Sequence, residues 1–159
     1  MNPILKICVK NQTAALQLGS SCVQTYTIST AKNGLGERDG SGCTPRGHHV
    51  IRAMIGATCP INSVFVGRRP TGEIYGQALR AQYPNRDWIL TRILWLSGLH
   101  VGYNRLGHVD TMRRYIYLHG TPASEPMGVP LSHGCIRMRN EDVIDLFNRV
   151  APGTQVYIE

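Results

Sequence analysis

The sequence lacks any apolar run of about 18 residues, the length that a membrane-spanning helix needs. Its N-terminal segment holds only one short apolar stretch, residues 4–9, which Lys6 interrupts. That stretch has no basic flank and no small-residue cleavage site, so we expect no export signal. We therefore expect a protein without a membrane span in the cytoplasm, or in the periplasm if an export signal has been removed.

Internal repeats and low-complexity segments are also absent. The 159 residues are 42% hydrophobic and 17% charged, which is ordinary for a folded soluble protein and too apolar for a disordered one. This length fits one domain, which we place over residues 1–159. The 17 glycines and nine prolines are spread along the chain, so many turns and short strands are expected.

Acidic residues are scarce, with ten against 17 basic ones, for a formal charge of +7. The arginines are scattered through the sequence and form no basic helix or recognisable nucleic-acid motif. We therefore expect no nucleic-acid partner and favour a solvated basic surface. An acidic small substrate or a polyanionic matrix remains as an alternative reason for the charge.

A disulfide framework is not indicated, because the five cysteines are odd in number and irregularly spaced. This pattern predicts free thiols in a reducing compartment. Cys8 and Cys22 fall in strand-like runs, where we expect them to be buried as small apolar side chains. Cys43 and Cys59 fall in loops.

Alternating polarity predicts a mainly β fold with one or two helices. Residues 4–9 and 14–18 are expected to form a hairpin. Further strands are expected at 22–30, 48–55, 114–120 and 154–159, with loops at 31–47 and 97–112. Residues 88–96 fit either a buried strand or a helix, and in 57–87 only a short helix within 73–83 is suggested.

One helix is well marked near the C-terminus. Asn140 is a suitable N-cap, and Glu141 and Asp142 place negative charge in the first turn, where it complements the helix dipole. Apolar residues then recur on one face, at Val143, Ile144, Leu146, Phe147 and Val150. Pro152 and Gly153 are expected to end the helix.

The segment LSHGCIRM, residues 131–138, has the features of a cysteine nucleophile. A reactive cysteine needs a base or a positive charge nearby to form its thiolate. Cys135 has His133 two residues before it and Arg137 two residues after it, on one face of an extended backbone. Gly134 leaves room for a carbonyl oxygen to approach backbone N–H groups, as an oxyanion hole requires.

A second histidine could serve as the base. His119 ends the predicted strand 114–120, on the same face as Tyr115 and Tyr117 and opposite Ile116 and Leu118. A short loop then returns the chain to Cys135. The residues alone do not decide between His119 and His133.

The combination of His119-Gly120 with the run Ser132 to Arg137 resembles the signature of the L,D-transpeptidase catalytic domain, the YkuD family. Thr44-Pro45-Arg46-Gly47 resembles a further element of that family. The similarity extends over about residues 4 to 159 and is specific in the last third. It implies a β-sandwich-like domain, with the catalytic cysteine in a turn before the C-terminal helix.

The resemblance also implies roles for the catalytic residues. Cys135 would be the nucleophile and His119 its general base, with the Gly120 carbonyl orienting the imidazole. Ser132 and His133 would shape the site, and the backbone amides of Gly134 and Cys135 would hold the oxyanion.

Substrate contacts are expected from two further residues. Arg137 would pair with a substrate carboxylate, for which its planar guanidinium is suited. Tyr117, on the same strand face as His119, is the second candidate. Neither a metal nor a cofactor is expected.

The reaction implied by the resemblance is cleavage of the diaminopimelate–D-alanine bond of peptidoglycan stem tetrapeptides. Because no export signal is evident, we favour an L,D-carboxypeptidase that acts on muropeptides during recycling. An L,D-transpeptidase that forms 3-3 cross-links or exchanges D-amino acids is the alternative.

Three readings of another class are weaker. His100, His108 and Asp110 could belong to a zinc peptidase, although the spacing of a complete ligand set is missing. Cys43 and Cys59 with His48 or His49 could hold a structural zinc ion, but adjacent histidines on a strand point to opposite faces. A binding module with an inactive site is the non-enzymatic reading.

Overall fold

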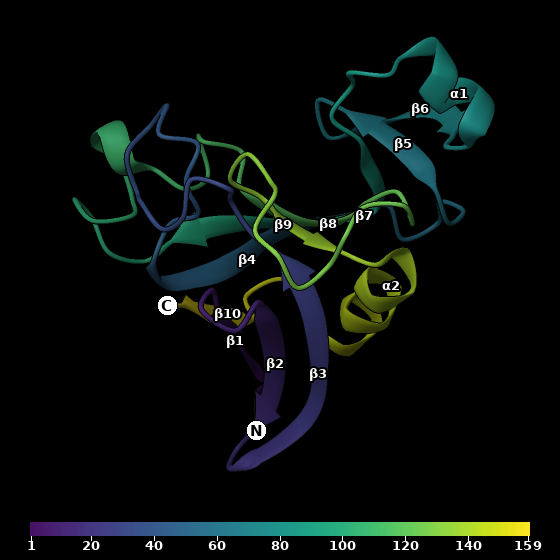
Figure 1. Cartoon of the computed structure of the whole chain (residues 1–159). Coiled ribbons are helices and arrows are strands. Elements are labelled where there is room, and N and C mark those ends of the chain that lie inside the picture. The colour runs from purple at the N-terminus through teal and green to yellow at the C-terminus, as the bar shows by residue number, and fades with distance from the viewer.

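The computed structural model describes residues 1–159 as a curved β structure with two α-helices at its periphery (Figure 1). The first strands are β1 (Ile4–Cys8), β2 (Thr13–Leu18), β3 (Ser21–Ser29), β4 (Gly47–Ile55), β5 (Ser63–Val66) and β6 (Arg69–Ile74). They are followed by α1 (Gln77–Gln82), β7 (Ile89–Gly98), the 3-10 helix η1 (Gly107–Val109), β8 (Tyr117–Gly120), β9 (Ile136–Met138), α2 (Asn140–Arg149) and β10 (Gln155–Ile158). The expected mainly β fold with one or two helices is confirmed.

The strands form one sheet in the order β4-β10-β1-β2-β3-β9-β8-β7-β5-β6. An additional pairing of β4 with β7 closes most of this sheet on itself. Strands β8 and β9 are parallel neighbours, in a register that places His119 opposite Arg137. This pairing sets the start of β8, at Tyr117, beside the turn that carries Cys135.

The N-terminal hairpin follows directly from its alternating sequence. Strands β1 and β2 pair antiparallel, with Leu5 opposite Leu16 and Ile7 opposite Ala14. These four side chains are buried in the main core, while Lys6 between them is exposed. The hairpin expected at residues 4–18 is confirmed.

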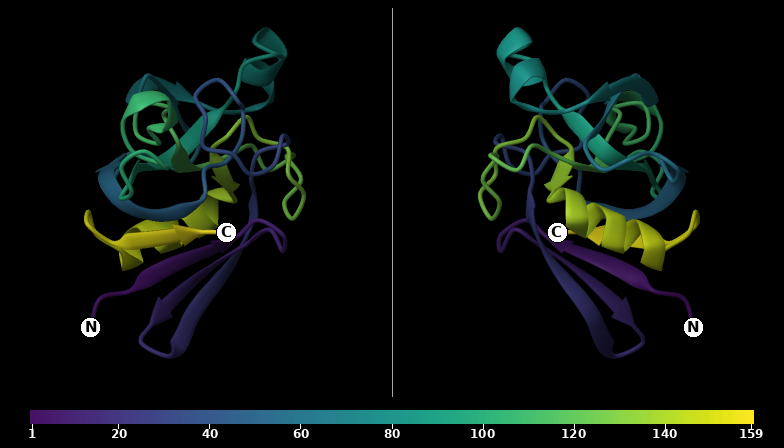
Figure 2. Two further views of the ribbon diagram at one scale, coloured as in Figure 1. Left: turned by 90° about the vertical axis from the view of Figure 1, so that its left-hand side faces the viewer. Right: turned by 90° about the vertical axis from the view of Figure 1, so that its right-hand side faces the viewer.

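The β2–β3 hairpin extends beyond the rest of the molecule (Figure 2). The first five residues of β3 are exposed on both faces, and burial begins only at Tyr26. Cys22 lies in the exposed part, and Cys8 at the end of β1 is only half-buried. The expectation that both cysteines are buried was therefore wrong, because strand-like alternation does not show where a strand leaves the core.

The middle of the chain contains elements that the sequence did not reveal. Residues 89–96 belong to strand β7 (Ile89–Gly98), which decides the strand-or-helix ambiguity. Residues 57–87 hold the β5–β6 hairpin as well as the expected short helix, α1. Strand β5 pairs with β7, so this segment extends the sheet beside the site.

Helix α2 buries Val143 and Leu146 against the main core, as the apolar stripe predicts. Its N-cap is Arg139, so the assignment of Asn140 as the cap was wrong. The Asn140 amide instead donates to the Thr121 carbonyl and to Asn62 Oδ1, and it accepts from Thr91 Oγ1. None of the helices could span a bilayer, since α2, the longest, has only ten residues.

Strand β8 is shorter than expected. It begins at Tyr117, because Tyr115 adopts a positive φ of 56° and interrupts the extended backbone. Leu118 and Ile116 enter the main core, whereas Tyr117 and His119 face the other side, as the alternation predicts.

Candidate active site

A cavity of about 300 Å³ opens on the face of the sheet where β8 and β9 lie side by side. Six residues singled out from the sequence line it: Tyr117, His119, Ser132, His133, Cys135 and Arg137. Arg68, Asp87 and Arg114 also line it, from segments that sequence reasoning did not connect with the site. The structure thus gathers residues that are more than 60 positions apart around one thiol.

His119 is buried at the end of β8, and its Nδ1 lies 2.6 Å from the carbonyl oxygen of Gly120. A carbonyl can only accept, so Nδ1 carries the proton and Nε2 keeps its lone pair. Burial lowers the pKa of His119 below its ordinary value, although the Gly120 contact acts in the opposite direction. The imidazole is therefore neutral at neutral pH and available as a base.

Cys135 precedes β9, and its sulfur contacts the backbone on both sides of Ile116. The Tyr117 N–H donates to Sγ at 3.3 Å, and the thiol donates to the Tyr115 carbonyl at 3.2 Å. Burial raises the pKa of the Cys135 thiol to about 12, and the nearby Asp87 carboxylate acts in the same direction. The Tyr117 N–H opposes this shift, as do Arg137 and Arg114. Cys135 and His119 are thus a neutral thiol and a neutral imidazole.

The turn before Cys135 is held by side-chain hydroxyl groups. Thr44 Oγ1 donates to the Gly134 carbonyl at 2.9 Å, and Ser132 Oγ accepts the Gly134 N–H at 3.2 Å while it donates to the Cys135 carbonyl. Gly134 has a φ of +138°, which few other residues adopt, and an added Cβ would lie 3.3 Å from the Cys43 carbonyl oxygen. Its amide is already bonded, whereas the Cys135 N–H has no protein acceptor.

Arg137 lines the cavity and lies between two acidic residues. Its Nη2 is 3.3 Å from Asp87 Oδ1, and its Nη1 is 3.8 Å from Glu125 Oε2. His133 is largely exposed, and its Nδ1 lies 3.8 Å from the second Asp87 oxygen. Asp87 therefore joins the two residues that flank Cys135.

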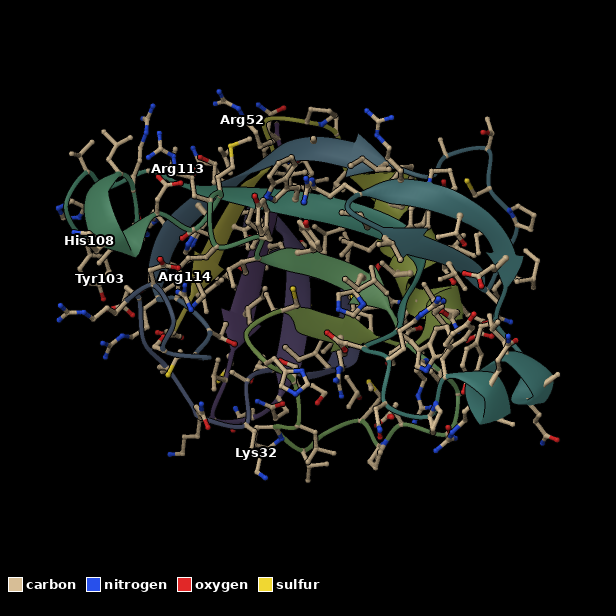
Figure 3. The ribbon with its side chains drawn as sticks, turned by 90° about the horizontal axis from the view of Figure 1, so that it is seen from above. Lys32, Arg52, Tyr103, His108, Arg113 and Arg114 are labelled. Atoms are coloured by element: carbon tan, nitrogen blue, oxygen red, sulfur yellow. The ribbon has the colours of Figure 1, made fainter.

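Two further arginines line the cavity. Arg68 donates to the Tyr117 hydroxyl at 3.0 Å. Arg114 donates to the carbonyls of Gly36 and Cys43 and to Ser41 Oγ, and burial lowers its pKa. Arg114 lies nearer the middle of the molecule than Tyr103 and His108 do (Figure 3). The sequence offered no signal for these contacts, which depend on loops far apart in the chain.

The residues considered above as zinc ligands have other partners. Asp110 accepts N–H groups of Leu106 and Arg113, and the His100 ring packs at a tilt against Tyr103. His49 is buried between the Gly47 carbonyl and Thr111 Oγ1.

The opposite orientation expected for the adjacent histidines agrees with their contacts, because the His48 ring packs on Tyr157. No three His, Cys, Asp or Glu side chains are grouped as a metal site would require.

The fold matches solved L,D-transpeptidases. L,D-transpeptidase 3 from Mycobacterium tuberculosis aligns with a TM-score of 0.61 at 14% identity, over 99% of this chain and 61% of the neighbour. The L,D-transpeptidase LdtMt1 in complex with imipenem aligns with a TM-score of 0.59 at 15% identity, over 99% of this chain and 59% of the neighbour. The chain therefore spans about three-fifths of the length of these proteins.

Relatives match over shorter segments. The putative L,D-transpeptidase YqjB of Bacillus subtilis is 40% identical over 63 residues, which are 40% of this chain and 34% of the relative. The probable L,D-transpeptidase YbiS of Escherichia coli K12 is 49% identical over 43 residues, 27% of this chain and 14% of the relative. The model of the YkuD family, the L,D-transpeptidase catalytic domain, matches residues 5–158, and the chain belongs to this family.

Proposed function

We propose that the chain is a cysteine acyl-transfer enzyme that cleaves the diaminopimelate–D-alanine bond of peptidoglycan stem tetrapeptides. The observation that carries this proposal is the placement of Cys135 and His119 on one cavity, with Nδ1 of His119 held by the Gly120 carbonyl. This contact leaves Nε2 as the base. Membership of the L,D-transpeptidase family supports the substrate class.

The reaction begins from the uncharged pair. As the Cys135 sulfur attacks the diaminopimelate carbonyl carbon, its proton passes to Nε2 of His119. The carbonyl oxygen becomes an oxyanion, for which the unpaired Cys135 N–H is the available backbone donor. The Gly134 N–H joins it only if it leaves Ser132 Oγ.

Collapse of the tetrahedral intermediate breaks the bond to the D-alanine nitrogen, which takes the proton from the imidazolium. A thioester remains on Cys135. A second nucleophile, deprotonated by the same imidazole, then attacks the thioester, and the thiol regains its proton. Water gives a tripeptide, whereas the amine of another stem gives a cross-link.

We favour water as the acceptor, and so an L,D-carboxypeptidase of muropeptide recycling. A cavity of about 300 Å³ is at the small end of ligand pockets and suits the end of a single stem peptide. All five cysteines are free thiols, which agrees with a reducing, cytoplasmic setting. Cross-linking remains the second candidate, because the relatives are named as L,D-transpeptidases.

Mass analysis of products tests the choice of acceptor. The protein is incubated with tetrapeptide, free or linked to a disaccharide, and we expect tripeptide and D-alanine with few cross-linked dimers. Dominant 3-3 dimers, or exchange of D-alanine for other D-amino acids with little hydrolysis, would instead identify a transpeptidase.

Intact-mass spectrometry with a carbapenem tests the nucleophile. The strained ring is an acyl donor, so we expect one covalent adduct on the wild type and none on Cys135→Ala. Substituting Cys8, Cys22, Cys43 or Cys59 by alanine should leave the adduct in place. An unmodified wild-type mass after long incubation would contradict this chemistry.

A further inference from the structure

The three arginines of the Cys135 cavity differ in what surrounds their charge. Arg137 lies within 3.3 Å of Asp87 and 3.8 Å of Glu125, so two carboxylates compensate it. Arg114 directs its guanidinium at three protein oxygens, of which the Cys43 carbonyl is 2.6 Å away. Arg68 has no carboxylate within salt-bridge distance.

Arg68 is nevertheless held in place. Its guanidinium carbon lies 4.5 Å from the Tyr115 ring centre and 5.0 Å from that of Trp95. One nitrogen, Nη1, donates to the Tyr117 hydroxyl at 3.0 Å. Aromatic faces and a hydroxyl hold a cation without neutralising it, so the remaining N–H groups keep their capacity to bind an anion.

The position of Arg68 connects it with the reacting sulfur. Arg68 occupies the turn between β5 and β6 with a positive φ of 65°, and it lines the same cavity as Cys135. The residue that it contacts, Tyr117, donates its backbone N–H to the Cys135 sulfur. An anion held by Arg68 therefore lies in the same cavity as the reacting sulfur.

We propose that Arg68 is a specificity-determining residue that binds a carboxylate of the stem peptide next to the scissile bond. This inference rests on the proposed function. Two carboxylates meet the description: the one on the side chain of diaminopimelate and the terminal one of D-alanine. The chemistry they share is a planar anion that a guanidinium can bind through two parallel hydrogen bonds.

Three substrates distinguish the two sources: the tetrapeptide, its diaminopimelate side-chain amide and its C-terminal amide. We expect the wild type to lose about ten- to a hundredfold in kcat/KM on the amide whose carboxylate Arg68 binds. In Arg68→Gln the ratio of kcat/KM on the tetrapeptide to kcat/KM on this amide should fall close to unity. The reason is that the variant also uses the tetrapeptide poorly, mainly because its KM is raised. The amide whose penalty disappears identifies the carboxylate.

Arg69→Gln is the matched control, since Arg69 is the exposed neighbour in β6 and does not line the cavity. It should keep every wild-type penalty. Arg68→Lys keeps the charge without the planar fork and should retain part of the penalty. Penalties that are unchanged in Arg68→Gln, or equal losses on all three substrates, would overturn the proposal.

Binding measurements separate this proposal from the proposed function. Calorimetry on Cys135→Ala, with and without Arg68→Gln, gives dissociation constants for the same three stems. An Arg68-dependent preference in binding without turnover by the wild type would support the carboxylate site and contradict the reaction. Turnover without any Arg68-dependent preference would overturn the carboxylate site alone.

Discussion

At the scale of single residues, the Cys135 thiol and the His119 imidazole meet the same physical constraint. Burial disfavours a charge on either group, so the pKa of the thiol rises while that of the imidazole falls. A stable thiolate–imidazolium pair is not expected in the free enzyme. Proton transfer then has to accompany attack on the substrate.

The pH profile of kcat/KM tests this arrangement. The base acts while His119 is neutral, so activity is lost as the pH falls through its pKa, which lies below the ordinary 6.5. We expect the midpoint of the acidic limb to lie below pH 6.5. An acidic limb centred at or above pH 6.5 would contradict a buried, neutral His119.

The two histidines of the site should differ strongly in their importance. His119→Ala removes the base and should reduce the acylation rate about a hundred- to ten-thousandfold. His133→Ala removes a largely exposed ring and is the matched control, with a much smaller loss. Single-turnover formation of the thioester measures both, and a larger effect at His133 would reverse the assignment of the base.

Cys135 and Arg137 could be predicted from the sequence because their neighbours in the chain are residue types suited to catalysis. It could not decide between His119 and His133, which requires knowing which imidazole is fixed by a carbonyl. It also missed Arg68, Asp87 and Arg114, whose side chains reach the cavity through tertiary contacts between distant segments. A local sequence pattern identifies functional groups on one loop, whereas their partners on distant segments can be identified only from the fold.

At the scale of elements, Asn140 joins three segments at the start of α2. Its buried amide bonds Thr91 of β7, Asn62 before β5 and the Thr121 carbonyl after β8. Gly120 leaves the space for it, since an added Cβ there would clash with Asn140 Oδ1. Asn140 thus connects the N-terminal end of α2 to the end of the strand that carries His119.

Asn140→Ala should therefore destabilise the fold. It removes the acceptor of the buried Thr91 hydroxyl, the donor to the buried Thr121 carbonyl and the donor to the half-buried Asn62 Oδ1, for a loss of about 2–4 kcal/mol in the free energy of unfolding. Urea unfolding measures the loss, and Asn148→Ala at an exposed position of the same helix is the control. Equal stability of the two variants would show that these hydrogen bonds contribute little.

Strand β4 contains a titratable group that links stability to pH. Burial lowers the pKa of His49 from 6.5 to about 4, between Gly47 and Thr111. The unfolded chain binds this proton more readily, so the stabilising contribution is complete above pH 6.5 and is lost as the pH falls towards 4. The total is about 3 kcal/mol, from 1.36 kcal/mol per pKa unit.

Comparison of the wild type with His49→Asn isolates this contribution, because His119 titrates alike in both. Between pH 7.5 and 5 the wild type should lose about 2 kcal/mol more than the variant in urea unfolding. Identical pH dependence of the two proteins would place the destabilising proton elsewhere.

Part of the secondary structure could be predicted from the sequence. Hairpin β1–β2 and helix α2 have strong local periodicity, and the structure contains both, whereas the apolar run 88–96 left strand and helix open until the structure showed β7. The β5–β6 hairpin has an irregular register and exposed residues along β6, so no alternation marks it. The closing pair of β4 with β7 joins strands about 40 residues apart, which no local pattern reports.

At the scale of the whole molecule, the protein carries a formal charge of +7, and the Cys135 cavity is itself rich in arginine. Lys32 lies at the opposite edge of the molecule from Arg52 and Arg113 in the view of Figure 3. No single cationic face is needed for such a charge to act at a distance. It attracts anionic molecules towards the protein and is screened by salt over about 10 Å at 0.1 M.

This predicts a dependence of catalysis on ionic strength. The proposed stem substrate carries several carboxylates, so kcat/KM should fall several-fold between about 50 and 500 mM NaCl, while kcat changes little. Attraction raises the rate of encounter, and it does not act on the acyl-transfer steps once the stem is bound. A stem whose carboxylates are all amidated is the control and should show a much weaker salt effect. Equal salt dependence for the acidic and the amidated stem would mean that the net charge of the protein plays no part in substrate capture.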